Sequence, residues 1–355
     1  MIKVFIIDDS AVVRTALTSL VEKEKDIQLI GTAQDPIFAM EKFQRQGWPD
    51  VIVLDIEMPR MDGLTFLKKI MATRPTPVII CSSIAPKGSR AAIEAMSLGA
   101  IEVIGKPEFQ VKNFFEEAHE KFVYVIRAAA KAKPKAISAQ ATFRAKIEDK
   151  LTADAVLMSV AKPSAMLQGE SYIAIGSSTG GVQTLEAIIT KLPVSVPPIL
   201  ITQHMPGGFT TSFAERLDRI SAVCVKEASH GDKLERGCVY IAPGELHMMV
   251  KRVASSLMIE IKNGPRVSRH KPSVDVLFRS CANEAPKSCT AFILTGMGDD
   301  GARGMKELHD RGARTYAQEE KSCIVYGMPK EAVAMGGVDK SLTPQQIVET
   351  IKSIR

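Results

Sequence analysis

The first part of the chain alternates short apolar runs with amphipathic stretches five times, and this alternation restricts the fold more than any other feature. The apolar runs are rich in β-branched residues and occupy positions 3–7, 27–33, 51–54, 78–81 and 101–104. Amphipathic stretches typical of helices follow at 11–21, 36–43, 64–72, 90–98 and 114–130. Strands that are apolar throughout are buried on both faces, as in parallel sheets with right-handed crossovers. We therefore expect a doubly wound (βα)5 domain with its ligand site at the carboxyl ends of the strands.

The second half predicts a larger α/β domain, in keeping with a length of 355 residues that exceeds a usual single domain. Strands are expected at 172–176, 198–202, 223–225, 239–241, 247–250, 257–261, 291–294 and 314–317, and helices at 182–191, 209–217, 274–283 and 302–311. This pattern favours a mostly parallel sheet with a small antiparallel excursion around 238–261. The stretch 128–169, rich in Ala, Lys, Ser and Gln, is typical of a linker. The predicted domains are therefore residues 1–127 and 170–355.

Composition and charge exclude several classes of protein. The content of 45% hydrophobic and 24% charged residues is that of a globular protein. No apolar run approaches the ~18 residues of a membrane span, and the N-terminus turns acidic too early for a signal peptide, so we expect a cytoplasmic protein without direct membrane insertion. The net charge of +6 forms no dense basic stripe, which argues against nucleic acid as a partner. Six cysteines without Cys-x-x-Cys spacing indicate reduced thiols rather than disulfides or a zinc site.

Acidic side chains stand at two neighbouring strand ends of the first domain. Asp8 and Asp9 follow the first strand and Asp55 follows the third. When these strands are adjacent, three carboxylates converge and repel one another unless a cation lies among them, and Mg²⁺ suits such a set. Ser82 and Lys106 end the fourth and fifth strands. Each residue alone is more often a helix cap or a solvated charge, but the five together favour phosphoryl transfer to a carboxylate.

This segment, residues 1 to about 125, resembles the receiver domain of bacterial response regulators. The matching motifs are Ile6-Ile-Asp-Asp-Ser10, Val53-Leu-Asp-Ile-Glu-Met-Pro59, Met61-Asp-Gly63, Ile80-Cys-Ser-Ser83 and Gly105-Lys-Pro107. The resemblance implies that Asp55 is the phosphoacceptor and that Asp8, Asp9 and Asp55 hold Mg²⁺. It further implies that Ser82 is the switch hydroxyl and that Lys106 contacts the phosphoryl group.

The second domain opens with a serine on a glycine-rich turn. Gly176-Ser-Ser-Thr-Gly-Gly181 follows a strand, precedes a helix and contains Gly-x-Ser-x-Gly, a turn that can expose Ser178 as a nucleophile. Such a turn is more often a phosphate cradle or a plain cap. A nucleophilic serine needs a base and an orienting acid. His204 ends the next strand, and Asp299 and Asp300 follow a later one, so the chain order Ser, His, Asp differs from that of standard α/β-hydrolases.

Two other interpretations of this half stay open on the residues alone. Gly296-Met-Gly-Asp-Asp-Gly301 is also a Gly-x-Gly-x-x-Gly motif, with Glu319 and Glu320 about where a ribose-binding acid stands in a dinucleotide site. Against this, Asp299 and Asp300 would face the pyrophosphate and repel it. The other interpretation is a binding module in which Ser178 is only structural.

The second half resembles the catalytic domain of CheB-type chemotaxis methylesterases. The matching stretches are Ala174-Ile-Gly-Ser-Ser-Thr-Gly-Gly181, Ile201-Thr-Gln-His-Met-Pro206, Phe209-Thr-Thr-Ser-Phe-Ala214, Tyr240-Ile-Ala-Pro-Gly244, Arg269-His-Lys-Pro-Ser-Val-Asp275, Ile293-Leu-Thr-Gly-Met-Gly-Asp-Asp-Gly301 and Tyr326-Gly-Met-Pro329. The resemblance implies a triad of Ser178 as nucleophile, His204 as general base and Asp300 as orienting acid. Backbone N–H groups near Thr179 and Met297 are the implied oxyanion donors, and a structural or substrate-groove role is expected for His270.

The two resemblances together cover nearly the whole chain. They imply a phosphorylation-activated serine hydrolase that demethylates glutamyl methyl esters, and deamidates glutamines, on methyl-accepting chemoreceptors. The implied phosphodonor is a histidine kinase of the chemotaxis pathway. Mg²⁺ would serve receiver phosphorylation, and ester hydrolysis would need no cofactor.

Overall fold

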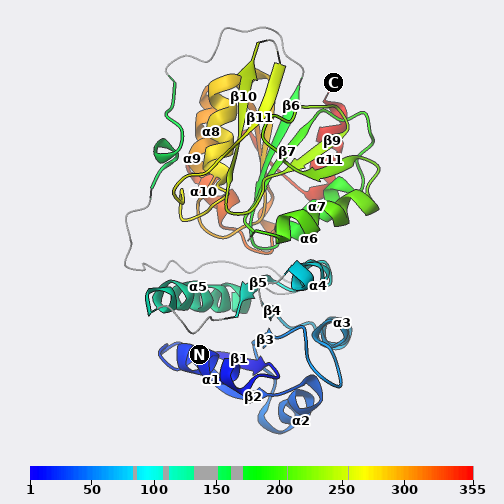
Figure 1. Cartoon of the computed structure of the whole chain (residues 1–355), viewed down its shortest axis with the longest axis vertical. Coiled ribbons are helices and arrows are strands. Elements are labelled where there is room, and N and C mark those ends of the chain that lie inside the picture. The colour runs from blue at the N-terminus through cyan, green and yellow to red at the C-terminus, as the bar shows by residue number, and fades with distance from the viewer. Residues whose placement is uncertain are drawn as a thin grey trace. The chain divides into compact units, whose positions relative to one another are not determined.

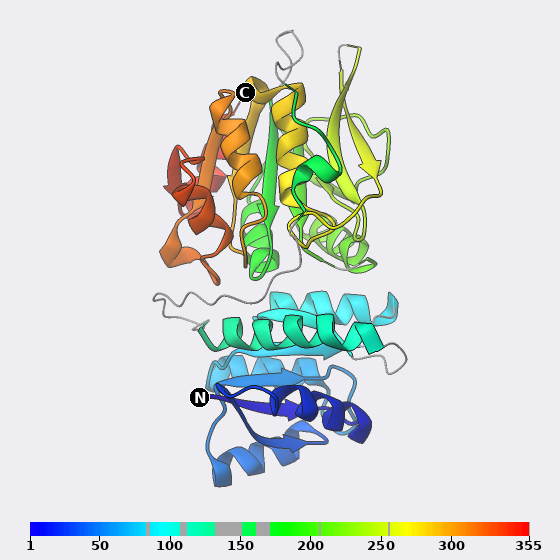
Figure 2. The same cartoon turned by 90° about the vertical axis from the view of Figure 1, so that its left-hand side faces the viewer.

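The structure is a computed structural model that describes residues 1–82, 86–106, 112–131, 151–160, 171–205, 207–254 and 256–354. The chain divides into two compact units, Met1–Ile137 and Ser138–Arg355. Each unit is built on its own parallel sheet (Figures 1 and 2).

The first unit is a five-stranded parallel sheet with strand order β2-β1-β3-β4-β5. Its strands are β1 (Ile2–Ile7), β2 (Ile27–Ala33), β3 (Val51–Leu54), β4 (Val78–Ser82) and β5 (Glu102–Gly105). Its helices are α1 (Ala11–Val21), α2 (Pro36–Gln46), α3 (Gly63–Thr73), α4 (Pro86–Ser97) and α5 (Lys112–Lys131). All four residues of β3 are buried, as the apolar pattern predicts. The predicted (βα)5 fold is therefore confirmed.

The helix caps of the first unit leave its strand-end acids available for a site. The Ser10 side chain caps α1 by accepting a hydrogen bond from the backbone N–H of Val13. Asp35 and Asp62 cap α2 and α3 in the same way. Because other residues perform the capping, Asp8 and Asp9 at the end of β1 are not needed for it.

The second unit has a seven-stranded sheet with order β14-β13-β12-β6-β7-β9-β8, in which every pairing is parallel. Its strands are β6 (Tyr172–Ser177), β7 (Ile199–Gln203), β8 (Cys224–Glu227), β9 (Cys238–Ile241), β12 (Cys289–Ile293), β13 (Arg314–Gln318) and β14 (Lys340–Leu342). Its helices are α6 (Gly181–Ile189), α7 (Phe209–Ile220), α8 (Val274–Glu284), α9 (Ala302–Asp310), α10 (Met328–Ala334) and α11 (Pro344–Ser353). The central strands β6, β7 and β12 are buried throughout.

The antiparallel excursion is smaller than predicted. Among the strands of the described residues, β10 (His247–Val253) and β11 (Ser256–Lys262) are the pair that runs antiparallel, as a separate ribbon beside α8 (Figure 1). Strand β9, which the prediction placed in the excursion, instead lies between β7 and β8 in the main sheet. Its short apolar run is buried except at its first residue, which suits a sheet interior.

Two parts of the stretch predicted as a linker are structured. Its first residues, 128–131, complete α5. Residues 151–160 contain a 3₁₀ turn, Ala153–Ala155, and pack on the second unit. The second domain therefore begins earlier than the predicted residue 170, while residues 132–150 and 161–170 lie outside the described residues.

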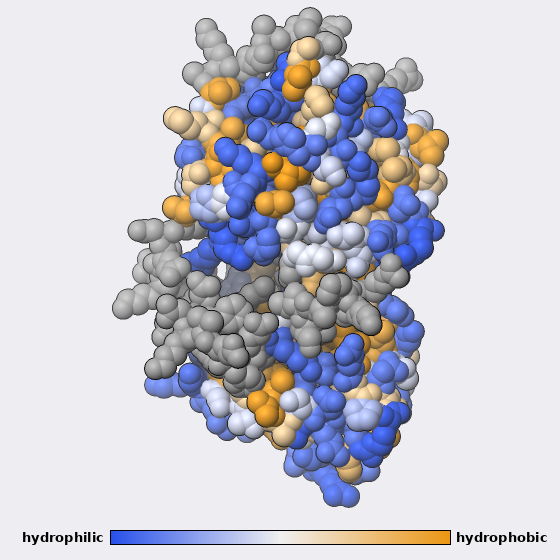
Figure 3. Space-filling model, viewed as in Figure 1, coloured by the Kyte–Doolittle hydropathy of each residue, from blue (hydrophilic) through white to orange (hydrophobic). Residues whose placement is uncertain are grey.

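The polarity of the surface and the length and polarity of the helices are those expected from the content of hydrophobic and charged residues. The face of the molecule seen in Figure 3 is largely hydrophilic, with hydrophobic residues scattered among polar ones. Among the described residues, every helix is too short or too polar to cross a bilayer.

The topology brings three loops to one edge of the second sheet. Strand β6 is flanked by β7 and β12, with Gly176 in register with both Thr202 and Ile293. The chain leaves all three parallel strands at the same end. The loops that carry the predicted serine, histidine and acid therefore meet there, as expected for a ligand site in an α/β sheet.

Candidate functional site

Ser178 lies on a tight turn between β6 and α6 that only glycine permits at its last two positions. Gly180 has a φ of +79°, in the left-handed region, and an added Cβ would lie 2.6 Å from Ile324 Cβ. A Cβ on Gly181 would lie 2.1 Å from Gln203 Oε1. Glycine at both positions therefore meets a steric demand of this turn.

The turn is held by hydrogen bonds from both neighbouring strands. Ser177 Oγ donates to Gln203 Oε1 at 2.7 Å, and Gln203 Nε2 donates to the carbonyl oxygen of Ser178 at 3.0 Å. From the other side, the Ser178 backbone N–H donates to the carbonyl oxygen of Thr295 at 3.1 Å. The backbone of Ser178 is thus fixed, and its side chain is largely buried.

His204 is fixed beside this turn at the end of β7. Its backbone N–H donates to the Ser177 carbonyl oxygen at 3.0 Å, and its ring Nε2 lies 2.7 Å from Asp300 Oδ2. Because Asp300 takes Nε2, Nδ1 is the ring nitrogen that can receive a serine proton. Within the described residues no hydrogen bond yet joins the Ser178 hydroxyl to the ring, and such bonds often form only when substrate binds.

Asp300 is completely buried at the N-terminus of α8. Its Oδ1 accepts hydrogen bonds from Ser273 Oγ at 2.7 Å and the Asp275 N–H at 3.1 Å, and its Oδ2 also accepts from the Val274 N–H at 2.7 Å. Burial raises the pKa of Asp300, against the opposing effects of the nearby His270 and of these hydrogen bonds. The positive end of the helix dipole favours a carboxylate at this position.

The structure distinguishes the two neighbouring aspartates. The bond to His204 comes from Asp300, while the carbonyl oxygen of Asp299 accepts a bond from the Ala302 N–H at the start of α9. The Asp300 carboxylate points to His204 and α8 rather than into a cradle for a diphosphate. This arrangement does not favour the dinucleotide interpretation of residues 296–301.

His270 lies directly against His204. The two imidazole rings stack with centroids 3.7 Å apart and planes 5° from parallel. The sequence predicted only a structural or groove role for His270, and the structure brings it into contact with the proposed base. Two further residues that sequence reasoning missed are Gln203 and Ser273, and the position of Ser273 directly before an apolar helical run was an available signal.

The two predicted oxyanion donors are neighbours of the serine. Thr179 follows Ser178 in the chain, and its carbonyl oxygen accepts a hydrogen bond from Thr295 Oγ1 at 3.0 Å. Met297 follows Gly296, where an added Cβ would lie 2.8 Å from Ser178 Cβ. Both backbone segments therefore adjoin the turn.

Gly296→Ala is expected to impair Ser178 more than the fold. The added Cβ would also lie 2.3 Å from Met328 Sδ and 3.0 Å from the Ser178 backbone nitrogen, so both Met328 and the turn must shift. We expect labelling of Ser178 by a serine-reactive phosphonate to slow by about tenfold or more, with a destabilisation of roughly 1–3 kcal/mol. The matched control is Gly207→Ala, where the added Cβ would lie 3.8 Å from the Gly244 carbonyl oxygen, an ordinary contact. Equal labelling rates for the two variants would contradict the close packing of Gly296 on Ser178.

The first unit gathers its predicted acids at the carboxyl edge of its sheet. Asp8, Asp9 and Asp55 offer oxygen atoms that all lie within 4.8 Å of one another. Lys106 Nζ lies 2.7 Å from Asp55 Oδ2 and 3.0 Å from Asp8 Oδ2. Burial raises the pKa of Asp55 to about 6, with Asp8 adding to the effect and Lys106 opposing it. Burial likewise raises the pKa of Asp8. Burial lowers the pKa of Lys106, but its bonds to the two carboxylates together outweigh this and raise it.

This cluster fits a small divalent cation by the chemistry of its donors. Three carboxylates around one point suit Mg²⁺, which combines few protein oxygens with several waters. Ser82 ends β4 in register with Gly105, next to Lys106, although its side chain and Pro107 lie outside the described residues. Gly63 at the start of α3 packs directly on the Asp55 backbone, since a Cβ there would lie 2.1 Å from the Asp55 carbonyl oxygen.

Comparison with known proteins matches each unit to a known family. Residues 4–117 match the response regulator receiver domain, and residues 173–351 match the CheB methylesterase family. A protein-glutamate methylesterase/protein-glutamine glutaminase of Chromobacterium violaceum is 52% identical over 100% of this chain and 99% of its own. One from Pseudomonas syringae pv. tomato is 50% identical over 99% and 98%.

A solved structure supports the second unit separately. The crystal structure of the Thermotoga maritima CheB methylesterase catalytic domain is 37% identical, with a TM-score of 0.51, and covers 53% of this chain and 100% of that one. With matches to full-length relatives as well, the chain belongs to the CheB methylesterase family, with a receiver domain preceding the catalytic domain.

Proposed function

We propose that this protein is a phosphorylation-activated serine hydrolase that removes methyl groups from glutamyl methyl esters of methyl-accepting chemoreceptors during chemotactic adaptation. The observation that carries the proposal is the 2.7 Å contact between His204 Nε2 and Asp300 Oδ2 beside the Ser178 turn. The names of the full-length relatives supply the substrate class. Both the receptor segments and the phosphodonor would meet the enzyme in the cytoplasm.

In the proposed reaction Ser178 is the nucleophile. Its oxygen attacks the ester carbonyl carbon while the hydroxyl proton passes to His204, and Asp300 stabilises the resulting imidazolium. Backbone N–H groups near Thr179 and Met297 would donate to the oxyanion. The C–O bond to the methoxy group then breaks and His204 returns the proton, so that methanol leaves. Water hydrolyses the acyl-enzyme by the same steps and leaves a glutamate carboxylate.

The same chemistry extends to receptor glutamines. A primary amide presents the same carbonyl carbon to Ser178, and ammonia takes the place of methanol as the leaving group. The acyl-enzyme is then identical, so its hydrolysis again gives glutamate. The relatives' names include glutaminase activity, which supports this second substrate.

The receiver would control the reaction through Asp55. A histidine kinase of the chemotaxis pathway is the proposed donor, with Asp55 attacking the phosphoryl group and Lys106 and Ser82 contacting the product. Mg²⁺ held by Asp8, Asp9 and Asp55 would offset the charge on the phosphoryl oxygens. Because phosphorylation replaces the single negative charge of the Asp55 carboxylate by a group of only about −1.5 to −2 charge, its effect on the catalytic unit requires an element with two alternative arrangements.

Acetyl phosphate tests this regulation in the full-length protein. We expect it to speed methanol release from methylated receptor membranes, and Asp55→Asn to remove that acceleration while keeping the basal rate. The basal rate persists because Asp55 lies outside the catalytic unit. Asp50→Asn, which changes an exposed carboxylate of the same unit, is the matched control and should respond like the wild type. Full acceleration in Asp55→Asn would contradict the role of Asp55.

A further inference from the structure

Residues 151–160, which we call the strap, dock on the catalytic unit along α8 (Figures 1 and 2). The sequence predicts that this segment belongs to a linker. Ala153 and Val156 are buried in a cluster with Met249, Val267 and Val276, from strand β10, a loop and α8. The strap is therefore anchored by apolar side chains rather than lying loosely on the surface.

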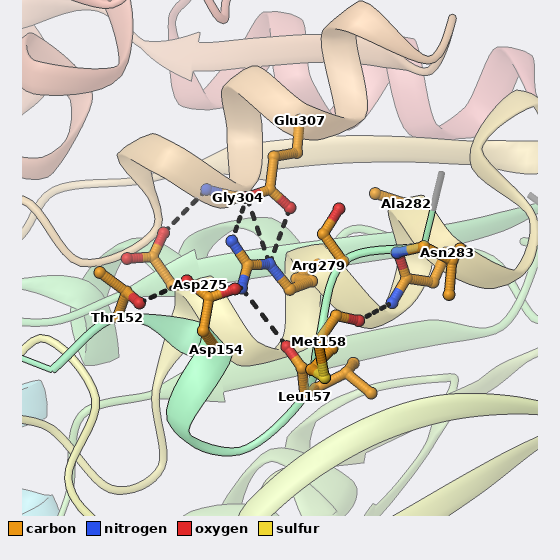
Figure 4. Close-up of polar contacts among 12 residues, drawn as sticks. Thr152, Asp154, Leu157, Met158, Asp275, Arg279, Ala282, Asn283, Gly304 and Glu307 are labelled. Atoms are coloured by element: carbon orange, nitrogen blue, oxygen red, sulfur yellow. Dashed lines mark hydrogen bonds and ion pairs between the residues drawn. The ribbon is translucent and has the colours of Figure 1, made fainter. Parts of the chain in front are cut away.

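Polar contacts from Arg279 on α8 also hold the strap (Figure 4). Arg279 Nη1 lies 2.6 Å from Asp154 Oδ1 and donates to the carbonyl oxygen of Leu157 at 3.3 Å. Its remaining N–H groups bind Glu307 on α9. Arg279 is only 8% exposed but Asp154 is 63% exposed, so this ion pair is partly solvated and adds modestly to the apolar anchoring of the strap.

Two more residues secure the far end of the strap. Asn283 Nδ2 donates to the carbonyl oxygen of Met158 at 3.0 Å, and its Oδ1 accepts from the Val160 N–H at 3.1 Å. Arg311 Nη2 donates to Ser159 Oγ at 2.9 Å. The strap is thus tied to α8 and to the end of α9 along its length.

The near end of the strap holds the loop that carries His270. The carbonyl oxygen of Leu151 accepts a hydrogen bond from the Ser268 N–H at 2.9 Å, and Ser268 Oγ donates to Asp275 Oδ2 at 3.0 Å. Ser268 and Arg269 have φ values of +50° and +70°, which cost energy in residues other than glycine. Such a conformation persists only where neighbouring contacts impose it.

A continuous set of contacts therefore joins the strap to the catalytic histidine. Ser268 leads to His270, whose N–H donates to the Val267 carbonyl oxygen at 2.8 Å in a closed turn. The His270 ring in turn stacks on His204. We propose that the strap is a positioning element, and that its docking holds His270 against His204 and so sets the orientation and proton affinity of the general base. This inference rests on the proposed role of His204.

Val156→Asp in the full-length protein tests the inference, because it places a carboxylate in the buried cluster and releases the strap. We expect faster amide hydrogen exchange at Ser268. We also expect a roughly ten- to hundredfold lower kcat for methanol release with little change in KM, because a misplaced catalytic group costs that much. The apparent pKa of the kcat/KM profile should shift as well. The matched control is Val194→Asp, at a 63% exposed valine of the same unit. It should leave the exchange at Ser268, kcat and the apparent pKa unchanged.

Two further variants separate this role from a general loss of stability. Asp154→Asn removes the charge that pairs with Arg279 at a largely exposed side chain, so the variant should fold. It should change the exchange at Ser268, kcat and the apparent pKa in the same direction as Val156→Asp but by less. In a His270→Gln background, Val156→Asp should lower kcat no further, because the strap acts through His270.

The inference is overturned if Ser268 exchanges faster in these variants while kcat and the pH profile match the wild type. It is also overturned if neither strap variant changes the exchange at Ser268. Absence of methanol release from the wild-type protein would refute the proposed function instead, and the exchange data would still report on the strap.

Discussion

Ser178→Ala is expected to lower methanol release from methylated receptor membranes by about 10⁶-fold, the loss typical of removing a catalytic serine. Alanine has no oxygen to attack the ester carbonyl, so no acyl-enzyme forms. Phosphorylation of Asp55 should proceed at the wild-type rate, because Asp55 belongs to the other compact unit. The measurement is timed methanol release alongside phosphoprotein formation with acetyl phosphate.

Ser177→Ala is the comparison within the same turn. Ser177 Oγ donates to Gln203, so its loss weakens the turn by about 1 kcal/mol without removing a nucleophile. Its effect on methanol release should be far smaller than that of Ser178→Ala. Substantial release by the Ser178→Ala protein would remove Ser178 from its proposed role.

Asp300→Asn is expected to lower kcat by about 10⁴-fold, the loss seen when the orienting acid of such a triad becomes an amide. Both carboxylate oxygens accept backbone hydrogen bonds, from Val274 on one side and Asp275 on the other. Either orientation of an asparagine amide therefore turns an NH₂ group toward an N–H donor. The ring of His204 loses its defined partner, and α8 loses the anion at its N-terminus. Steady-state kinetics and thermal unfolding measure the two effects.

The neighbouring Asp299→Asn is the matched control for this prediction. It changes a partly exposed carboxylate in the same loop and keeps the bond between Asp300 and His204. We expect only a small change in kcat. A loss as large as that of Asp300→Asn would show that the two aspartates share the role.

Much of the architecture could be predicted because buried parallel strands have a simple sequence pattern. The runs at 27–33 and 51–54 are strands with the predicted bounds, and the helix at 11–21 is likewise observed. Chain order and strand pairing then place Ser178 beside His204 without any side-chain information, since Ser177 and Gln203 are in register. The acid cluster of the first unit follows from the same reasoning.

Other features depend on contacts between distant parts of the chain. Residues 151–160 lie within a stretch rich in Ala, Lys, Ser and Gln that is typical of a linker, and it is contacts with distant residues, such as the packing of Val156 and the pairing of Asp154 with Arg279, that make them part of the second unit. Strand β14 has three residues, two of them exposed, and so gives little apolar signal. The stacking of His270 on His204 arises from a turn whose φ values no sequence pattern indicates.

The central claim is that one hydroxyl, on Ser178, is activated by His204 and Asp300. The most direct test treats the full-length protein with a serine-reactive phosphonate and locates the adduct by tandem mass spectrometry. We predict a single rapid adduct on Ser178, slowed by methylated substrate and by Asp300→Asn. An adduct on Ser177 or elsewhere, or labelling of Ser178 that neither substrate nor Asp300→Asn affects, would contradict the claim.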